Sequence, residues 1–157
     1  MKNLIFIRHG KATHEPMPDI DRHLTEKGIR RTRKHANLLK THNIYPDLII
    51  TSPAQRAYQT AEIVADIYKY PLDKILINKK FYFEPEEFVY NEILSFPNKK
   101  NTIFIVGHNP IWTEMADAFS NQGIMHLRTS GIIGIAFDTD DWTDIEIAVK
   151  KDLILIN

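Results

Sequence analysis

Three short apolar runs, each followed by a polar turn and a helix start, constrain the fold of this chain most strongly. The runs cover residues 3–7, 47–51 and 102–106. Continuous apolar runs of this length are typical of strands that are buried on both faces of a parallel sheet. Strands that alternate with helices predict an α/β fold, with a mostly parallel central sheet between two layers of helices.

The segment after residue 23 predicts a helix with a strongly basic outer face. Thr25 is a suitable N-cap, and Leu24 and Ile29 are spaced as a hydrophobic staple. The helix should run to about Lys40, with Ile29 on its inner face. Its basic residues are Lys27, Arg30, Arg31, Arg33 and Lys34. Such a face is usually solvated, and the alternative is a docking surface for an acidic partner protein.

The sequence predicts two more helices, which begin directly after the apolar runs at 47–51 and 102–106. Ser52 is expected to cap a helix that begins at Pro53 and runs to about Tyr68. In the same way, Asn109 is expected to cap a helix that begins at Pro110.

The C-terminal part predicts a change from parallel to antiparallel pairing. Residues 131–137, 144–149 and 153–156 look like consecutive strands, with a turn at 138–141. A short strand at 75–77 and an acidic helical segment that ends near Phe96 complete the pattern. The expected fold is therefore a three-layer α/β/α sandwich with antiparallel edge strands, formed by residues 1–157 as one domain.

Composition narrows the class of protein. The chain has 157 residues, of which 43% are hydrophobic, and its 20 basic and 20 acidic residues balance. A net charge of zero argues against a general nucleic-acid or membrane binder, so any anion site must be local. The absence of cysteine excludes disulfides and thiolate chemistry. With neither a signal peptide nor a long apolar run, the sequence predicts a cytoplasmic protein.

Polar side chains follow each of the three apolar runs. Arg8 and His9 follow the first, Ser52 and then Arg56 follow the second, and His108 follows the third. The carboxyl ends of parallel strands meet at one edge of a sheet, where ligands bind in α/β folds. Helix N-termini and guanidinium groups both favour phosphate. The sequence therefore predicts a phosphate site at this edge.

Taken together, these motifs resemble those of the histidine phosphatase superfamily, which has the phosphoglycerate mutase-like fold. The short chain is similar to the SixA-type phosphohistidine phosphatases in particular. The matching motifs are Arg8-His9-Gly10, Arg56 within residues 52–61, Gly107-His108-Asn109-Pro110, Leu24-Thr25-Glu26-Lys27-Gly28 and Thr129-Ser130-Gly131.

The resemblance implies that His9 is a nucleophile that becomes a phosphohistidine and is then freed by water. A neutral imidazole can act as the nucleophile near neutral pH. Arg8, Arg56 and a protonated His108 would hold the oxygens of the transferring phosphoryl group, which supplies most of the catalysis in such a reaction. No metal ion or other cofactor is expected.

Other residues are expected to border the same phosphate. Gly10 allows close approach of the backbone, while Ser52 and Asn109 are helix caps first and phosphate contacts second. Arg22, in the loop at residues 11–23, is a further candidate. Four residues of that loop, His14, Asp19, Asp21 and His23, match no known metal-binding spacing.

The substrate depends on the general acid. In the resembling phosphatases of phosphate esters a carboxylate protonates the leaving group, and Glu84 lies in the corresponding part of this chain. A leaving imidazole needs less help, and a short chain leaves the site open to a protein side chain. The first expectation is therefore phosphohistidine on a phosphorelay-type partner protein. The alternatives are a phosphatase of small phosphorylated metabolites that uses Glu84, a mutase, and a phosphate-binding module without turnover.

Overall fold

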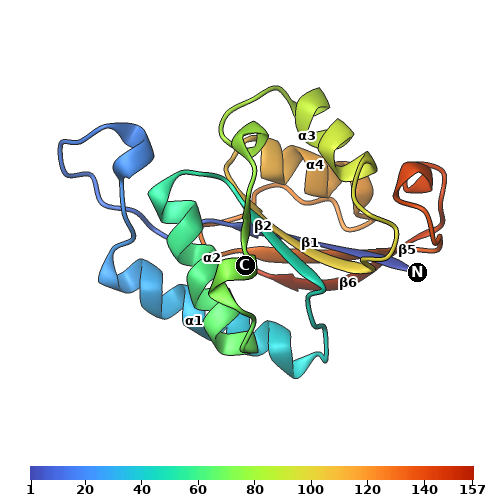
Figure 1. Ribbon diagram of the computed structural model, residues 1–157, viewed down its shortest axis with the longest axis horizontal. Helices are drawn as coiled ribbons and strands as arrows, with labels where there is room; N and C mark the ends of the chain where they lie inside the picture. The colour runs from blue at the N-terminus through green and yellow to red at the C-terminus, as the bar shows by residue number, and fades with distance from the viewer.

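The computed structural model describes residues 1–157 and contains one six-stranded sheet with helices on both faces (Figure 1). The strand order is β3-β2-β4-β1-β5-β6. The strands are β1 (Lys2–Arg8), β2 (Leu48–Thr51), β3 (Leu76–Ile77), β4 (Thr102–Gly107), β5 (Ile132–Phe137) and β6 (Lys150–Ile156). The helices are α1 (Glu26–Thr41), α2 (Gln55–Tyr68), α3 (Glu86–Leu94) and α4 (Ile111–Phe119), with short 3₁₀ turns η1 (Asp19–Asp21), η2 (Leu72–Lys74), η3 (Lys79–Phe81) and η4 (Trp142–Asp144).

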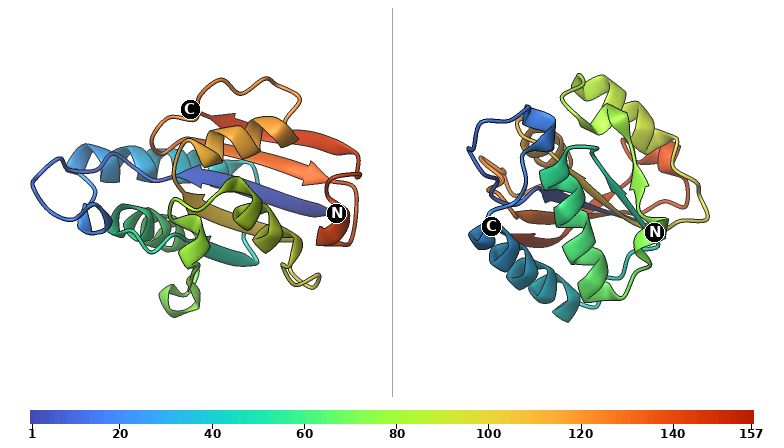
Figure 2. Two further views of the ribbon diagram at one scale, coloured as in Figure 1. Left: turned by 90° about the horizontal axis from the view of Figure 1, so that it is seen from above. Right: turned by 60° about the vertical axis from the view of Figure 1, so that its left-hand side comes forward.

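The strand directions confirm a mostly parallel sheet with an antiparallel edge. Strand β4 pairs parallel with both β1 and β2, and β2 pairs parallel with β3. Strand β5 is antiparallel to β1, and β6 is antiparallel to β5, so β6 again runs in the direction of β1. The loop that follows β1 projects beyond the carboxyl end of that strand (Figure 2, left).

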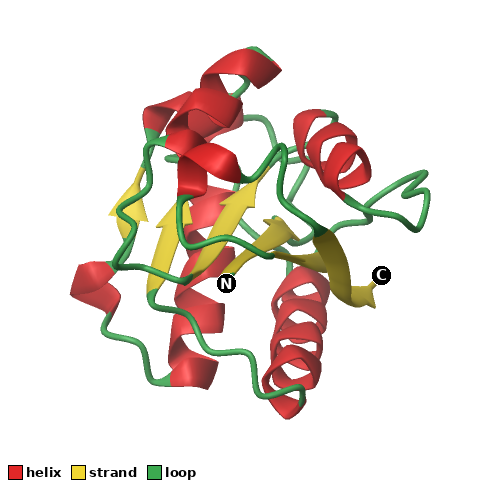
Figure 3. Ribbon diagram, turned by 90° about the vertical axis from the view of Figure 1, so that its right-hand side faces the viewer, coloured by secondary structure: helices red, strands yellow, loops and turns green.

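Alternating side chains of the strands form two cores, one on each face of the sheet. In β1, Leu4 and Phe6 pack with α3 and α4, whereas Ile5 and Ile7 pack with α1 and α2. Figure 3 shows the sheet, in yellow, between the helices. Because both faces are covered, the strands are apolar throughout, and the predicted three-layer α/β/α sandwich is confirmed.

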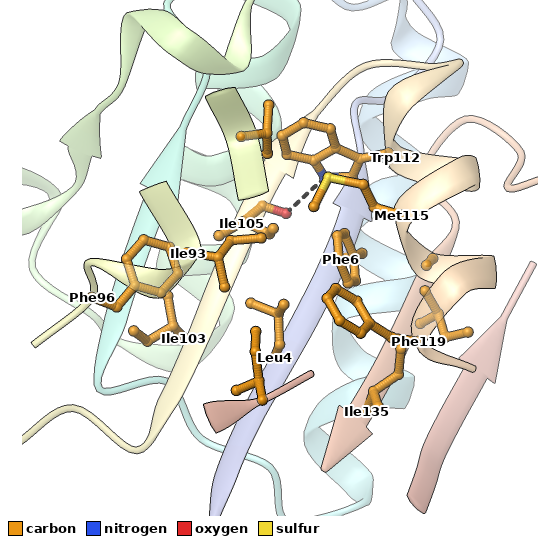
Figure 4. Close-up of a cluster of buried hydrophobic side chains, with 14 of the residues drawn as sticks. Leu4, Phe6, Ile93, Phe96, Ile103, Ile105, Trp112, Met115, Phe119 and Ile135 are labelled. Carbon is orange, nitrogen blue, oxygen red and sulfur yellow. Dashed lines mark hydrogen bonds between the residues drawn. The ribbon is translucent and has the colours of Figure 1, made fainter. Parts of the chain in front are cut away.

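Trp112, from α4, lies at one end of the core between the sheet and the helices α3 and α4 (Figure 4). Its indole Nε1 donates to the carbonyl of Ile105 over 3.2 Å, which satisfies the polar atom of a side chain that is only 1% exposed. The Phe6 ring meets the Trp112 ring edge to face, at 6.3 Å between centroids. This packing fixes the start of α4 against the end of β4.

The structure corrects the predicted strand at residues 144–149. The chain there forms the turn η4, in which the Asp141 side chain accepts the Thr143 amide, and pairing resumes only at Lys150. Trp142 and Ile145 are both fully buried, because the turn places them against the end of the sheet. The apolar residues that this turn buries resemble the residue pattern of a strand, which explains the wrong prediction.

The helix boundaries were predicted well, but several details were wrong. Thr25 caps α1 by accepting the Gly28 amide, yet Ile29 is 36% exposed and lies outside the core. Helix α2 begins at Gln55, so Ser52 is not its N-cap. Helix α4 begins at Ile111, although Asn109 still accepts the Thr113 amide. None of these helices combines the length and apolarity that crossing a membrane requires.

Candidate active site

His9 lies just past the end of β1, and its ring is fixed by its own neighbour. Nδ1 lies 2.7 Å from the carbonyl oxygen of Gly10. A carbonyl can only accept, so Nδ1 carries the proton and Nε2 keeps its lone pair. The side chain is 9% exposed. The backbone of β1 thus presents one nucleophilic nitrogen at the carboxyl edge of the sheet.

The surroundings of His9 keep its imidazole neutral. Burial, together with the positive charges of Arg56, Arg8 and Arg22, lowers the pKa of His9 from 6.5 to about 4, against the opposing effect of the Gly10 carbonyl. Desolvation and nearby cations both disfavour the protonated ring. The lone pair on Nε2 is therefore available throughout the physiological pH range.

His108 follows β4 and faces His9, with 5.0 Å between the ring centroids. Its Nε2 lies 2.7 Å from Ser52 Oγ, which also accepts the Ala54 amide. A Ser52 hydroxyl that donates to Nε2 leaves the ring proton of His108 on Nδ1. That Nδ1 is buried and has no hydrogen-bond partner. Ser52 thus contacts the ring of His108 and does not line the cavity.

The surroundings of His108 in this structure disfavour the protonated ring that the resemblance implies. Burial, followed by the proximity of His9 and Arg56, lowers the pKa of His108 to about 2. The ring is 3% exposed and packs beside Phe83, with 4.9 Å between centroids. His108 therefore offers a neutral N–H donor, and the arginines supply the positive charge.

Arg56 comes from the first turn of α2 and is almost completely buried, at 2% exposure. Its Nη1 donates to the Asp19 carbonyl over 2.8 Å, and its Nη2 pairs with the Asp19 carboxylate at 3.1 Å. The Nε of Arg56 is buried and unpartnered. Asp19 also accepts from Tyr82 and Arg22. The loop after β1 is thereby attached to α2.

Arg8 is held on the other side of His9 by residues that precede β5. Its Nη1 donates to the Leu127 carbonyl over 3.1 Å, and Asn109 Nδ2 donates to the same oxygen over 2.9 Å. Asn109 Oδ1 accepts from the Thr113 amide and hydroxyl. The Nε of Arg8 is buried without a partner. Asn109 therefore caps α4 and also positions the neighbours of Arg8.

A cavity of about 290 Å³ connects these residues, and we call it the His9 cavity. Its lining is mostly cationic or aromatic, and it contains a single carboxylate. The lining residues are Arg8, His9, Lys11, Ala12, His14, Asp19, Arg22, Arg56, Phe83, His108, Asn109 and Thr129. Three strand ends and the loop after β1 thus meet around one small polar space.

Besides Ser52, two predicted site residues lie outside this cavity, Glu84 and Gly10. Glu84 is exposed and is not part of the lining, because α3 starts two residues later and turns the chain away. The Gly10 amide donates to Thr60 over 2.9 Å instead of facing the cavity. A Cβ at Gly10 would lie 2.8 Å from Thr32 Oγ1, so this glycine permits close packing of β1 on α1.

The sequence did not predict the roles of Asp19, Tyr82 and Phe83 in this site. In the aromatic run 81–83, only Phe81, at 1% exposure, belongs to the core. Phe83, at 55% exposure, lines the cavity instead, and its ring lies 6.0 Å from the Arg56 guanidinium. No local pattern marks these residues, because their partners are distant in sequence. The structure gathers no group of three or more His, Asp or Glu side chains that could hold a metal ion, so the loop residues 14–23 form no such cluster.

Sequence comparisons find known proteins that are similar to part or most of this chain. Residues 4–75 match the model of the histidine phosphatase superfamily (branch 1). A 2,3-bisphosphoglycerate-dependent phosphoglycerate mutase of Rhodococcus opacus is 37% identical over 67 residues, which are 40% of this chain and 27% of the mutase. The chain thus spans about a quarter of the length of such curated mutases. An uncharacterized protein of a Picosynechococcus strain is 34% identical over 84% of this chain and 83% of its own length.

Solved structures are similar over almost the whole chain. The protein histidine phosphatase SixA, complexed with tungstate, superposes with a TM-score of 0.82 at 21% identity, covering 98% of this chain and 96% of SixA. A mycobacterial glucosyl-3-phosphoglycerate phosphatase gives a TM-score of 0.67 at 14% identity, covering 97% of each chain. Residues 4–75 thus match the histidine phosphatase superfamily, and the fold of the whole chain is that of the SixA-type structures.

Proposed function

We propose that this protein is a metal-independent phosphatase that works through a phosphohistidine on His9 and acts on phosphohistidine side chains of a partner protein. One observation carries the proposal. Around the neutral His9 ring, three buried nitrogen donors have no acceptor within the protein: Arg8 Nε, Arg56 Nε and His108 Nδ1. Buried donors are normally paired, so three unpaired donors in residues of one cavity indicate an oxyanion ligand.

The first half of the reaction transfers the phosphoryl group to His9. The Nε2 lone pair attacks phosphorus, and the bond between phosphorus and the leaving nitrogen breaks with its electron pair. Arg8, Arg56 and His108 stabilise the equatorial oxygens. The positive charge that develops on the His9 ring is stabilised by the Gly10 carbonyl, 2.7 Å from Nδ1.

The second half restores the enzyme. Water attacks phosphorus on the face opposite Nε2, and the bond from phosphorus to Nε2 breaks with its electron pair returning to the ring. The water proton stays with the released phosphate. His9 is again neutral with its proton on Nδ1, which matches its pKa of about 4.

The state of Asp19 favours phosphohistidine over a phosphate ester. Hydrogen bonds from Tyr82, Arg22 and Arg56 lower the pKa of the Asp19 carboxyl to about 2. This one carboxylate of the His9 cavity is therefore ionised and cannot protonate a departing alkoxide. An imidazole that is protonated on its far nitrogen leaves as a neutral molecule and needs no such acid.

The test compares two leaving groups. A phosphohistidine peptide and phenyl phosphate are assayed with the wild type, His9→Ala and Glu84→Gln. We expect kcat/KM to be at least about 100-fold higher for the peptide, which is the range that a general acid contributes to ester hydrolysis. His9→Ala should lose both activities, and Glu84→Gln should keep both.

The outcomes separate the alternatives. If Glu84→Gln lost only the hydrolysis of phenyl phosphate, Glu84 would be the acid of an ester phosphatase. A preference of the wild type for phenyl phosphate would contradict the phosphohistidine assignment. Full activity of His9→Ala would contradict catalysis by His9.

A further inference from the structure

A second, larger depression lies beside the His9 cavity, between α1 and the end of β6. Its volume is about 530 Å³, and none of its lining residues is hydrophobic. We call it the basic groove, and it is lined by Lys27, Arg30, Arg31, Lys34, His35 and Asn157. The right-hand view of Figure 2 shows the C-terminus beside the first turns of α1, in blue.

The four cations of the basic groove have no partner within the chain. The ion pairs of the structure involve none of Lys27, Arg30, Arg31 and Lys34. By contrast, Arg33 on the same helix pairs with Asp66 at 3.0 Å. Since the net charge of the chain is zero, this face holds cations whose counter-charges lie elsewhere.

These charges destabilise the helix that carries them. Lys27 and Arg31, and likewise Arg30 and Lys34, are like charges four residues apart, and such pairs destabilise a helix. Lys27 also lies in the first turn of α1 (residues 26–41), at the positive end of its dipole. An external anion would remove both costs.

The groove opens at the same edge of the sheet as the His9 cavity. Strand β6 runs in the direction of β1, so Asn157 and His9 both follow carboxyl ends of strands at one edge. Ser130 joins the two sites, because its amide donates to the His9 carbonyl and its own carbonyl accepts from His35 Nδ1 at 2.6 Å. The adjacent Thr129 lines the His9 cavity.

We infer that the basic groove docks an acidic segment of the phosphorylated partner protein while its phosphohistidine occupies the His9 cavity. This inference rests on the proposed function. A purely polar, cationic lining fits carboxylate side chains rather than an apolar helix. A partner that crosses the Thr129–Ser130 segment reaches both sites at once, and complementary charge increases its rate of association.

The test uses two synthetic peptides that differ only in charge. Each carries one phosphohistidine, followed from the third to the eighth position by glutamates in one peptide and glutamines in the other. At ~3.3 Å per extended residue these positions reach about 10–26 Å from the phosphorylated side chain. We expect the wild type to show about tenfold higher kcat/KM for the glutamate peptide at low ionic strength, and salt at 0.5 M to abolish that preference.

Two variants with equal loss of charge locate the effect. The groove variant combines Lys27→Gln, Arg30→Gln, Arg31→Gln and Lys34→Gln, and should treat both peptides alike while hydrolysing free phosphohistidine as the wild type does. The control replaces four exposed lysines near the opposite edge of the sheet by glutamine, and should keep the preference. Its changes are Lys69→Gln, Lys74→Gln, Lys99→Gln and Lys151→Gln.

The results distinguish failure of docking from failure of the proposed function. Equal kcat/KM for both peptides in the wild type, or a preference that survives in the groove variant, would overturn docking while leaving catalysis intact. If neither peptide were hydrolysed, the proposed function would fail. Binding of the unphosphorylated, fluorescently labelled peptides would then decide: anisotropy that favours the glutamate peptide only when the groove is intact supports docking, and equal binding overturns it.

Discussion

Arg56 and Asp19 form a two-point contact inside the His9 cavity. One terminal nitrogen of Arg56 donates to the Asp19 carbonyl at 2.8 Å, and the other pairs with the carboxylate at 3.1 Å. The backbone contact holds the guanidinium in place, whereas the carboxylate places a negative charge where an oxyanion is expected. Asp19 therefore both orients the arginine and opposes the binding of anions.

Asp19→Asn should tighten the binding of inorganic phosphate. Removing the carboxylate charge ends its repulsion of the ligand, which we put at ~1 kcal/mol, or about fivefold in Kd at low salt. The backbone contact to Arg56 remains. Isothermal titration calorimetry measures the change, and Asp21→Asn, an equal change of charge outside the cavity lining, should leave Kd within about twofold of the wild type. Weaker binding in Asp19→Asn would show that orientation of Arg56 outweighs repulsion.

Ser52→Ala should lower kcat by roughly 10- to 100-fold, although Ser52 does not line the cavity. The variant removes the hydroxyl that contacts His108 but leaves the ring itself, so the loss should be smaller than the roughly 100- to 1000-fold cost of deleting an oxyanion donor. If Ser52 acts through His108, adding Ser52→Ala to His108→Asn should cost little more. Steady-state kinetics of the two single variants and the double variant make the test, and multiplicative losses would contradict it.

His9 and His108 should have pKa values far below the usual range for histidine. The pKa values of about 4 for His9 and about 2 for His108 predict that neither ring changes its charge between pH 8 and 5. NMR of the histidine ring protons, assigned through His9→Ala and His108→Asn, tests this among the 7 histidines. An inflection near pH 6.5 for either residue would contradict the burial argument.

The same shifts predict that acid weakens the fold. Both histidines have a lower pKa in the folded chain than the ordinary 6.5, so the unfolded chain binds more protons below that pH. Between pH 6.5 and 5 each contributes roughly 2 kcal/mol of lost stability, at 1.36 kcal/mol per pH unit. Urea unfolding at pH 7 and pH 5 should show the loss, and His9→Ala should reduce it. An unchanged difference in that variant would exclude His9 as a cause.

Gly28→Ala should destabilise the protein even though alanine favours helices. A Cβ at Gly28 would collide with the carbonyl oxygen of Lys11, a residue that lines the His9 cavity. Separating α1 from this segment should cost about 1–3 kcal/mol, as overpacking generally does. Urea unfolding gives the free energy, with Asn37→Ala on the exposed face of α1 as control. Stability equal to or above that of the wild type would contradict the close packing.

The sequence was sufficient for the features that follow from local pattern. Apolar runs predicted the buried strands, and the carboxyl ends of those strands located Arg8, His9 and His108, which the parallel sheet β2-β4-β1 necessarily brings to one edge. The position of Arg56 was predicted in the same way, because this residue lies at the start of α2. These residues need only strand direction and helix position to be placed.

The features that escaped prediction depend on contacts between distant residues. Asp19 meets Arg56 and Tyr82 across separations of 37 and 63 residues, which no periodicity reports. Ser52 looked like a helix cap because its hydroxyl does accept the Ala54 amide, while its bond to His108 is visible only in three dimensions. Glu84 was proposed as a general acid only from its position in the sequence. In the structure it precedes α3 and is not part of the cavity lining.

The most direct test of the central claim is to trap the phosphorylated enzyme. Wild type, His9→Ala and a His42→Ala control are mixed briefly with a peptide that carries ³²P-phosphohistidine, quenched in alkali and analysed for label and by peptide mass. The account predicts label on wild type and control, located on His9, stable to alkali and lost in acid, with none on His9→Ala. Label that persists in His9→Ala, or full turnover of the peptide without label on His9, would contradict it.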